Sequence, residues 1–148
     1  PFVSCSSTAA GLIEMTYVVA YIATAVSFLA IDFIWLGYIA KHFYRREIGA
    51  LLLENFNMAA AVGFYLMFVV GILIFAVLPA LQAGSWKTAL IYGALFGFFT
   101  YATYDMTNLA TLKGWSVSVV VVDMAWGAFI TGVAALAGYF ATRAIVGG

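Results

Sequence analysis

Four long apolar runs constrain this chain more than any other feature of its sequence. Each run has about 25 residues and few charges, and a helix needs about 20 mostly apolar residues to cross a bilayer. The runs occupy residues 16–40, 58–83, 86–109 and 117–141. The whole chain is 66% hydrophobic and 8% charged, whereas a soluble domain carries about 25% charged residues. These features exclude a water-soluble fold and predict an all-α, polytopic integral membrane protein with a bundle of four transmembrane helices.

The first linker, residues 41–57, is the longest of the three. Its apolar side chains recur near helical spacing, at Phe43, Ile48, Leu51 and Leu52, while its charged residues lie elsewhere. A helix of this kind buries one face in the headgroup region and leaves the other face in water. We expect an interfacial helix here, with a plain loop as the alternative, and short turns at the other two linkers.

Basic residues in short loops indicate which side of a membrane each loop faces. With four spans, both termini and the second linker lie on one side, and the first and third linkers lie on the other. The first and third linkers carry Lys41, Arg45, Arg46 and Lys113, and the other side carries Lys87 and Arg143. This balance predicts a cytoplasmic location for the first and third linkers.

Residues 1–14 differ in character from the rest, since they are small, rich in serine and begin without methionine. They lack the basic region and the apolar core of a secretory signal. Three origins stay open, namely a cloning remnant, the residue of a processed targeting segment and a native extension, and Met15 has the position of an original start. We leave residues 1–14 out of the predicted fold and treat residues 15–148 as one transmembrane domain.

Three aspartates lie inside the apolar runs, where charges are rare. An ionised residue at mid-bilayer costs about 2.5 to 3.5 kcal/mol on insertion scales, so each of them calls for an explanation. Asp32, Asp105 and Asp123 each lie within about three helical turns of the first or third linker. We therefore expect the three carboxyl groups to approach the same membrane face at the same depth.

Each aspartate has a hydrogen-bonding residue three positions later, on its own helical face. The two Asp-x-x-Trp segments that result hint at an inverted internal repeat, with chance similarity as the alternative. The predicted polar pocket near this membrane face consists of Asp32, Trp35, Tyr101, Tyr104, Asp105, Asn108, Asp123 and Trp126. We favour a functional site, because intramembrane ionisable residues have that role by default. The alternative is that the aspartates are hydrogen-bonded packing elements.

Small residues recur along the third and fourth runs and predict close helix packing. Gly93 and Gly97 form a GxxxG element, and Gly127 and Gly138 belong to a row of small side chains. Such residues let helix backbones approach closely. We assign all four to helix packing, and the face from Gly93 to Gly97 is also a candidate contact in a homo-oligomer.

The residue types present exclude several kinds of site. The single Cys and single His cannot complete a structural zinc site, and no apolar run contains a His that could bind haem. The balanced charge argues against nucleic-acid binding. A hard cation held by Asp32, Asp105, Asp123 and Asn108 is a less favoured alternative. We assign no metal and name no cofactor.

Three segments resemble motifs of a known family. They are Ile-Asp-Phe-Ile-Trp-Leu-Gly at 31–37, Ala-Thr-Tyr-Asp-Met-Thr-Asn-Leu-Ala-Thr-Leu-Lys-Gly-Trp at 102–115 and Val-Asp-Met-Ala-Trp-Gly at 122–127. On these segments the chain resembles, from residue 15 to about residue 143, a family of small predicted bacterial membrane proteins, domain of unknown function 2177. The resemblance implies a four-span protein of the bacterial inner membrane and no particular activity. The stretch before Met15 departs from the family pattern, which leaves an organellar membrane open.

These observations lead us to expect a module that binds or translocates a small ligand, a proton or a cation, with Asp105 and Asp123 as the foremost residues. One alternative is a non-catalytic accessory subunit of a larger membrane assembly, such as a photosynthetic or respiratory complex. Another is a lipid-modifying enzyme with Asp and Tyr as acid and base, which we rank last because no nucleophile signature accompanies the acids. The expected partners are the lipid bilayer and either further copies of the chain or the subunits of such a complex.

Overall fold

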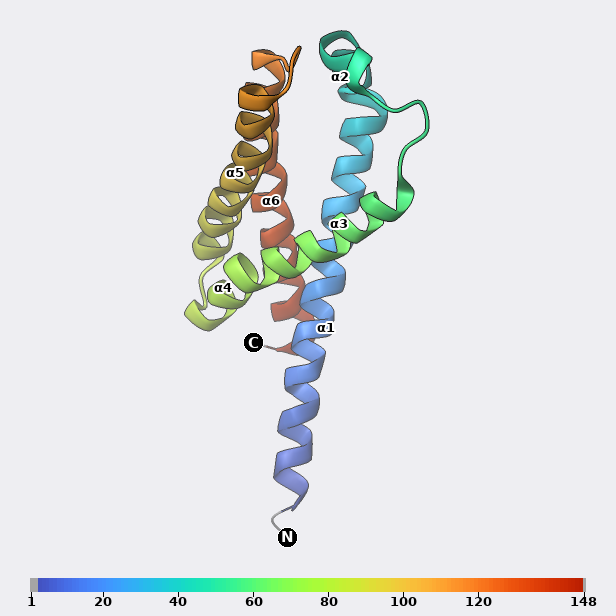
Figure 1. Ribbon diagram of the computed structural model, residues 1–148. Coiled ribbons are helices and arrows are strands. Elements are labelled where there is room, and N and C mark those ends of the chain that lie inside the picture. The colour runs from blue at the N-terminus through green and yellow to red at the C-terminus, as the bar shows by residue number, and fades with distance from the viewer. Residues whose placement is uncertain (1–2, 148) are drawn as a thin grey trace.

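The computed structural model describes residues 3–147, with side-chain environments from residue 10 onward, and every regular element in that range is helical (Figure 1). Two π-helical segments, η1 and η3, and one 3₁₀ turn, η2, connect or interrupt the α-helices. The elements are α1 (Val3–Ile34), η1 (Trp35–Ile39), α2 (Lys41–Ile48), η2 (Gly49–Leu51), α3 (Met58–Ile72), η3 (Leu73–Val77), α4 (Leu78–Ala83), α5 (Trp86–Thr111) and α6 (Val117–Val146). The predicted all-α fold class is thus confirmed.

Among the described residues, three helical stretches are long and apolar enough to cross a membrane. They are Ala10–Ile39, Met58–Ala83 and Val117–Val146, which correspond to the first, second and fourth predicted spans. The third predicted span is α5, a helix of 26 residues. Its length of about 39 Å would suffice, but its tyrosines, its threonines and its polar C-terminal half make it less apolar. Three spans are therefore supported, and the count of four stays a prediction.

Helix α1 begins at Val3 and runs without interruption through Met15. The stretch set apart in the sequence therefore continues this helix from Val3 onward. The N-terminal part of α1 extends beyond the other helices (Figure 1) and carries exposed apolar side chains, such as Leu12 and Ile13. Apolar surface of this kind is favourable in hydrocarbon and unfavourable in water, which suits a helix that contacts lipid.

The first linker contains the expected helix in a shorter form. At Ala40, whose amide donates to the Trp35 carbonyl at 2.8 Å, the chain leaves η1 and turns into α2. After α2 and η2, residues 52–57 form an irregular loop rather than further helix. Asn57 then caps α3, because its side chain accepts a hydrogen bond of 3.1 Å from the Ala60 amide.

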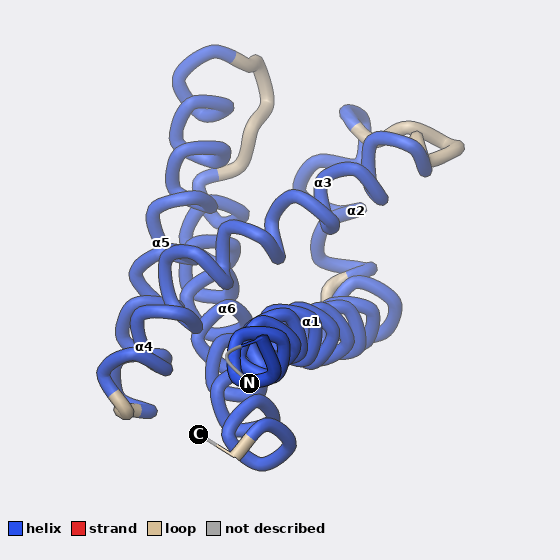
Figure 2. The backbone as a smooth tube through the Cα atoms, turned by 90° about the horizontal axis from the view of Figure 1, so that it is seen from below, coloured by secondary structure: helices blue, strands red, loops and turns tan. Residues whose placement is uncertain are grey.

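Glycines allow α5 and α6 to pack side by side along their length (Figures 1 and 2). A Cβ atom on Gly97 would lie 2.0 Å from the carbonyl oxygen of Gly127, and one on Gly93 would also clash with α6. Gly138 approaches α1 as closely, since a Cβ there would lie 2.1 Å from Oγ1 of Thr24. The face from Gly93 to Gly97 is therefore covered within the chain and is not free to contact a second copy.

The apolar core lies where α1, α6 and the α3–η3 segment cross. Phe28, Ile72 and Ile130 have no exposed surface there and belong to one cluster of buried side chains. Helix α3 passes diagonally across α1 and α6 at this level, whereas toward α2 the helices diverge (Figure 1). The crossing thus fills the bundle at one level, and the helix axes separate beyond it (Figure 1).

Candidate functional site

A cavity of about 1270 Å³ lies between the diverging helices. Its wall is mostly apolar and comes from α1, η1, α2, α3, α5 and α6, with the linkers after η2 and before α6. The polar, charged and indole-bearing lining residues are Asp32, Trp35, Lys41, Tyr44, Arg45, Tyr65, Thr100, Tyr101, Tyr104, Trp115, Asp123 and Trp126. The structure therefore brings together all residues of the predicted polar pocket except Asp105 and Asn108.

Asp32 is buried at the contact of three helices, with 6% of its surface exposed. Its Oδ2 atom accepts a hydrogen bond of 2.5 Å from the Tyr65 hydroxyl of α3, and its Oδ1 atom accepts one of 3.2 Å from the Trp126 indole of α6. A buried carboxyl group is costly unless its oxygens are paired. Both oxygens of Asp32 have donors, so this residue ties α1, α3 and α6 together.

Asp123 differs from Asp32 because only one of its oxygens is engaged. Oδ1 accepts a hydrogen bond from the Tyr44 hydroxyl of α2, which in turn accepts one of 3.3 Å from the Trp35 indole. In the part of the chain that the structure describes, no residue donates to Oδ2 of Asp123, which is half-buried. Asp123 therefore fixes α2 against α6 and also offers an acceptor to the cavity.

The two Asp-x-x-Trp segments meet through their tryptophans. The rings of Trp35 and Trp126 stack with their centroids 4.2 Å apart and their planes 12° from parallel. Each indole donates toward the aspartate of the opposite segment, Trp126 directly and Trp35 through Tyr44. The repeated motif of the sequence thus forms one reciprocal contact between the end of the first span and α6.

Asp105 and Asn108 do not line the cavity. Asp105 has no exposed surface, and its carboxylate oxygens make no hydrogen bond of ordinary geometry within the described residues, although the Trp115 indole lies near enough to interact with them. That range also contains no group of three or more His, Cys, Asp and Glu side chains placed to hold a metal ion. The alternative of a hard cation shared by three aspartates is therefore not supported. Of Asp105 and Asp123, the two foremost residues of the prediction, only Asp123 lines the cavity.

Helix α2 supplies lining residues that the sequence pattern did not single out. Lys41, Tyr44, Arg45 and Ile48 recur at i, i+3, i+4 and i+7 and all face the cavity. A tyrosine in a linker is typical of an interfacial anchor. The only sequence signal that Tyr44 lines a cavity is the helical face that it shares with Lys41 and Arg45. The pKa of Tyr44 is raised, mainly by burial and secondly by the hydrogen bond to the Asp123 carboxylate. The raised pKa keeps the hydroxyl protonated, so that it acts as a donor. Tyr65, a polar residue of the second apolar run near the same membrane face, also lines the cavity, although it is not one of the eight residues predicted for the pocket.

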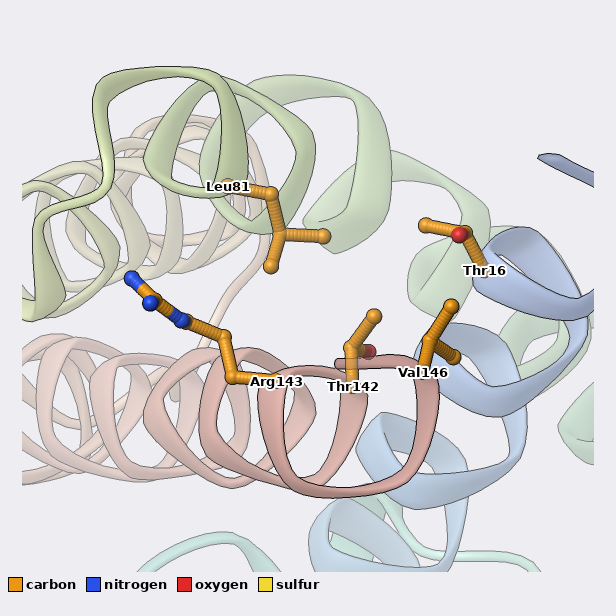
Figure 3. Close-up of a pocket in the computed structure, with 5 residues that line it drawn as sticks. All are labelled: Thr16, Leu81, Thr142, Arg143 and Val146. Carbon is orange, nitrogen blue, oxygen red and sulfur yellow. The ribbon is translucent and has the colours of Figure 1, made fainter. Parts of the chain in front are cut away.

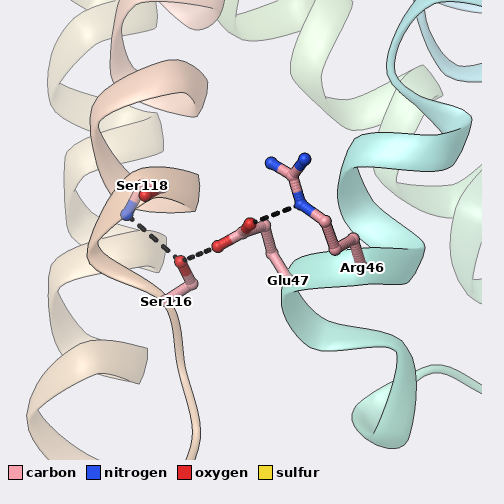
Figure 4. Close-up of polar contacts among 4 residues, drawn as sticks. All are labelled: Arg46, Glu47, Ser116 and Ser118. Atoms are coloured by element: carbon pink, nitrogen blue, oxygen red, sulfur yellow. Dashed lines mark hydrogen bonds and ion pairs between the residues drawn. The ribbon is translucent and has the colours of Figure 1, made fainter.

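A second set of polar contacts joins α2 to the start of α6 (Figure 4). The Ser116 hydroxyl donates to Oε2 of Glu47 at 2.6 Å, and Nε of Arg46 lies 3.0 Å from Oε1 of the same carboxylate. Ser116 also caps α6, because its Oγ atom accepts a hydrogen bond of 3.2 Å from the Ser118 amide. Together with Tyr44, these contacts hold α2 across the end of the cavity.

The contacts of Glu47 predict a shift of its pKa that can be measured. The hydrogen bond from Ser116 and then that from Arg46 lower the pKa of Glu47. Because the folded-state pKa is lowered, the contact contributes stability above the ordinary pKa of Glu, about 4.3, and this contribution is lost as the pH falls through the folded-state pKa. We expect Ser116→Ala to raise the pKa of Glu47 toward its ordinary value in a carboxyl ¹³C NMR titration. Arg46→Ala should raise it less, and an unchanged pKa in Ser116→Ala would contradict the contact.

A second, smaller cavity of about 140 Å³ lies toward the C-terminal end of α6 (Figure 3). It is lined by Thr16, Leu81, Thr142, Arg143 and Val146. Arg143 reaches from α6 toward α4, and its Nη1 atom donates to the Tyr139 hydroxyl at 3.2 Å. No acidic side chain and no residue of the predicted pocket lines this space. We therefore take the larger cavity as the candidate site.

The family of this chain follows from a match to a model of related sequences. The family model described as Predicted membrane protein (DUF2177) matches residues 17–140, and this range includes every residue of the larger cavity. Searches of curated proteins and of solved structures each found no match. The resemblance drawn from the three sequence segments is thus confirmed, and the chain belongs to the DUF2177 family of predicted membrane proteins.

Proposed function

We propose that this membrane protein binds a small organic ligand in the larger cavity. The observation that carries the proposal is the size of the cavity together with its lining. Ligand pockets are typically about 300–1,000 Å³ in volume, with mostly apolar walls and a few placed polar groups. The volume of about 1270 Å³ lies above that range, and the wall has the same character.

The polar groups on the wall favour an organic ligand over a small cation. Both oxygens of Asp32 are already paired, and Asp123 has one oxygen left. A hard cation takes about six to eight oxygen ligands, which this wall does not offer. One carboxylate oxygen among aromatic rings suits a ligand that brings its own hydrogen-bond donor.

The position of the core favours binding over translocation. Phe28, Ile72 and Ile130 fill the helix crossing next to the cavity and have no exposed surface. Close-packed interiors leave few voids larger than a water molecule. A ligand would therefore enter and leave on the same side of this crossing, as in a binding module.

A cavity-filling substitution tests the proposal. Ala61 of α3 lines the cavity, whereas Ala59 on the same helix is exposed and lies outside the lining. We expect Ala61→Trp to lower the occupancy of co-purifying small molecules at least about tenfold, because the indole takes up cavity volume. Ala59→Trp, the matched control, should retain them at the wild-type level.

Native mass spectrometry of protein purified in mild detergent measures this occupancy as an added mass. Thermal unfolding of the two variants shows whether both fold alike. Equal occupancy in Ala61→Trp and Ala59→Trp would contradict the proposal, and so would a wild-type protein with no bound molecule.

A further inference from the structure

We infer that the ligand is a phospholipid whose head group carries both a phosphate and a hydrogen-bond donor. This inference rests on the proposed function and specifies the ligand class for the same cavity. Three features of the wall carry it: two unpaired cations at one end, one available carboxylate oxygen beside them, and an apolar surface over the rest.

The two cations, Lys41 and Arg45, provide the phosphate contact. They lie one turn apart on α2, both face the cavity, and neither is paired with an acidic side chain in the described part of the chain. A guanidinium matches phosphate with paired N–H groups, and an ammonium adds a point charge. Arg46, the next residue along α2, is already paired with Glu47 and lies outside the lining.

Asp123 provides the contact to a donor on the head group. Tyr44, which holds Oδ1 of Asp123, lies on α2 between Lys41 and Arg45, so the available Oδ2 atom is at the same end of the cavity as the two cations. A carboxylate repels a phosphate unless the ligand brings a donor or a positive charge of its own. A primary ammonium or a hydroxyl on the head group meets this condition by donating to Oδ2.

The apolar part of the wall suits acyl chains. It includes Leu29 and Phe33 from α1, Leu36 from η1, and Phe64 and Phe68 from α3. Helix α2 follows directly on a stretch long enough to cross the membrane, so its basic residues lie where that span ends. Basic residues near a membrane surface attract anionic groups of lipids. The cavity thus presents cations and apolar surface in the same order as a phospholipid in the bilayer.

Two lipids that differ only in the donor test the inference. Dioleoyl phosphatidylethanolamine and dioleoyl phosphatidylcholine share their acyl chains and phosphate, but only the first has an N–H donor on its head group. In native mass spectrometry titrations of the detergent-solubilised protein, we expect phosphatidylethanolamine to bind at least about tenfold more tightly. Asp123→Asn should bring the ratio of the two affinities close to one, while the Asn carbonyl still accepts the bond from Tyr44.

A double variant that removes both positive charges tests the phosphate contact separately. Lys41→Gln/Arg45→Gln should weaken the binding of both lipids at least about tenfold. The matched control is Lys87→Gln/Lys113→Gln, because it removes the same charge from residues outside the lining. This control should bind both lipids as the wild type does, and an equal loss in both double variants would overturn the inference.

Equal affinity of the wild type for the two lipids would also overturn the inference. Ala61→Trp still reports on the proposed function in that case, because the indole fills the cavity for any ligand. The last measurement uses glycerophosphoethanolamine, which is the soluble head group of phosphatidylethanolamine without its acyl chains. If it displaces phosphatidylethanolamine from the protein at equal concentration, the ligand is a soluble molecule and the inference is overturned. If Asp123→Asn does not fold, the wild-type preference and the double variants decide between the outcomes.

Discussion

Gly97→Ala is expected to destabilise the protein by about 1 to 3 kcal/mol, the usual cost of overpacking a well-packed interior. The added Cβ would lie 2.0 Å from the carbonyl oxygen and 2.7 Å from the carbonyl carbon of Gly127. Both atoms are backbone, so the contact cannot be relieved by a change of rotamer, and α5 must move away from α6. The measurement is a thermal or SDS-induced unfolding midpoint in detergent, followed by tryptophan fluorescence.

Gly63→Ala is the matched control for this prediction. Gly63 lies in α3, and a Cβ atom there would meet nothing within 4 Å. Since alanine is the better helix former by about 1 kcal/mol, this variant should unfold at the wild-type midpoint or slightly above it. A Gly97→Ala protein as stable as Gly63→Ala would show that α5 and α6 do not pack as closely as described.

Asp32→Ala is expected to have the largest effect among the carboxylate variants. It leaves the Tyr65 hydroxyl and the Trp126 indole, both partly buried, without their acceptor. An unsatisfied donor costs about 1–3 kcal/mol when it is fully buried, so the loss of this acceptor by two partly buried donors corresponds to at most about 2–6 kcal/mol. The change should be visible as a lower unfolding midpoint and a broader size-exclusion profile in detergent.

Two further variants define what Asp32 does. Asp32→Asn should be intermediate, because its carbonyl still accepts one bond and its amide can donate to the oxygen of Tyr65. Asp123→Ala removes one hydrogen bond from a half-buried position and should destabilise the protein less. If Asp32→Ala were no less stable than Asp123→Ala, the assignment of Asp32 to helix packing and Asp123 to ligand contact would be wrong.

The helical class was predictable because long apolar runs leave few other structures in a bilayer. The Asp-x-x-Trp segments were also visible in the sequence, because Asp and Trp at i and i+3 share a helical face. Their reciprocal contact was not visible, since spacing within one helix does not show which neighbouring helix a side chain meets. Only the packing of α6 against the first span reveals that Trp126 donates to Asp32.

The environment of Asp105 could not be predicted from helical spacing. It lies one turn after Tyr101 on α5, yet Tyr101 lines the cavity and Asp105 does not. In a soluble helix the polar face indicates which side meets water, but a membrane helix is apolar on most sides. Gly93 and Gly97 turn this face of α5 toward α6, and Asp105 on the same face is buried without lining the cavity, which hydrophobicity alone does not indicate.

The filled crossing of α1, α3 and α6 closes the cavity toward one side of the bilayer. Because Phe28, Ile72 and Ile130 close the bundle on one side of the cavity, a lipid-binding protein of this shape would sample a single leaflet. A phospholipid in the opposite leaflet must first flip across the bilayer before it can bind. In vesicles with an asymmetric lipid distribution, the occupancy of the cavity would thus report the composition of one leaflet alone.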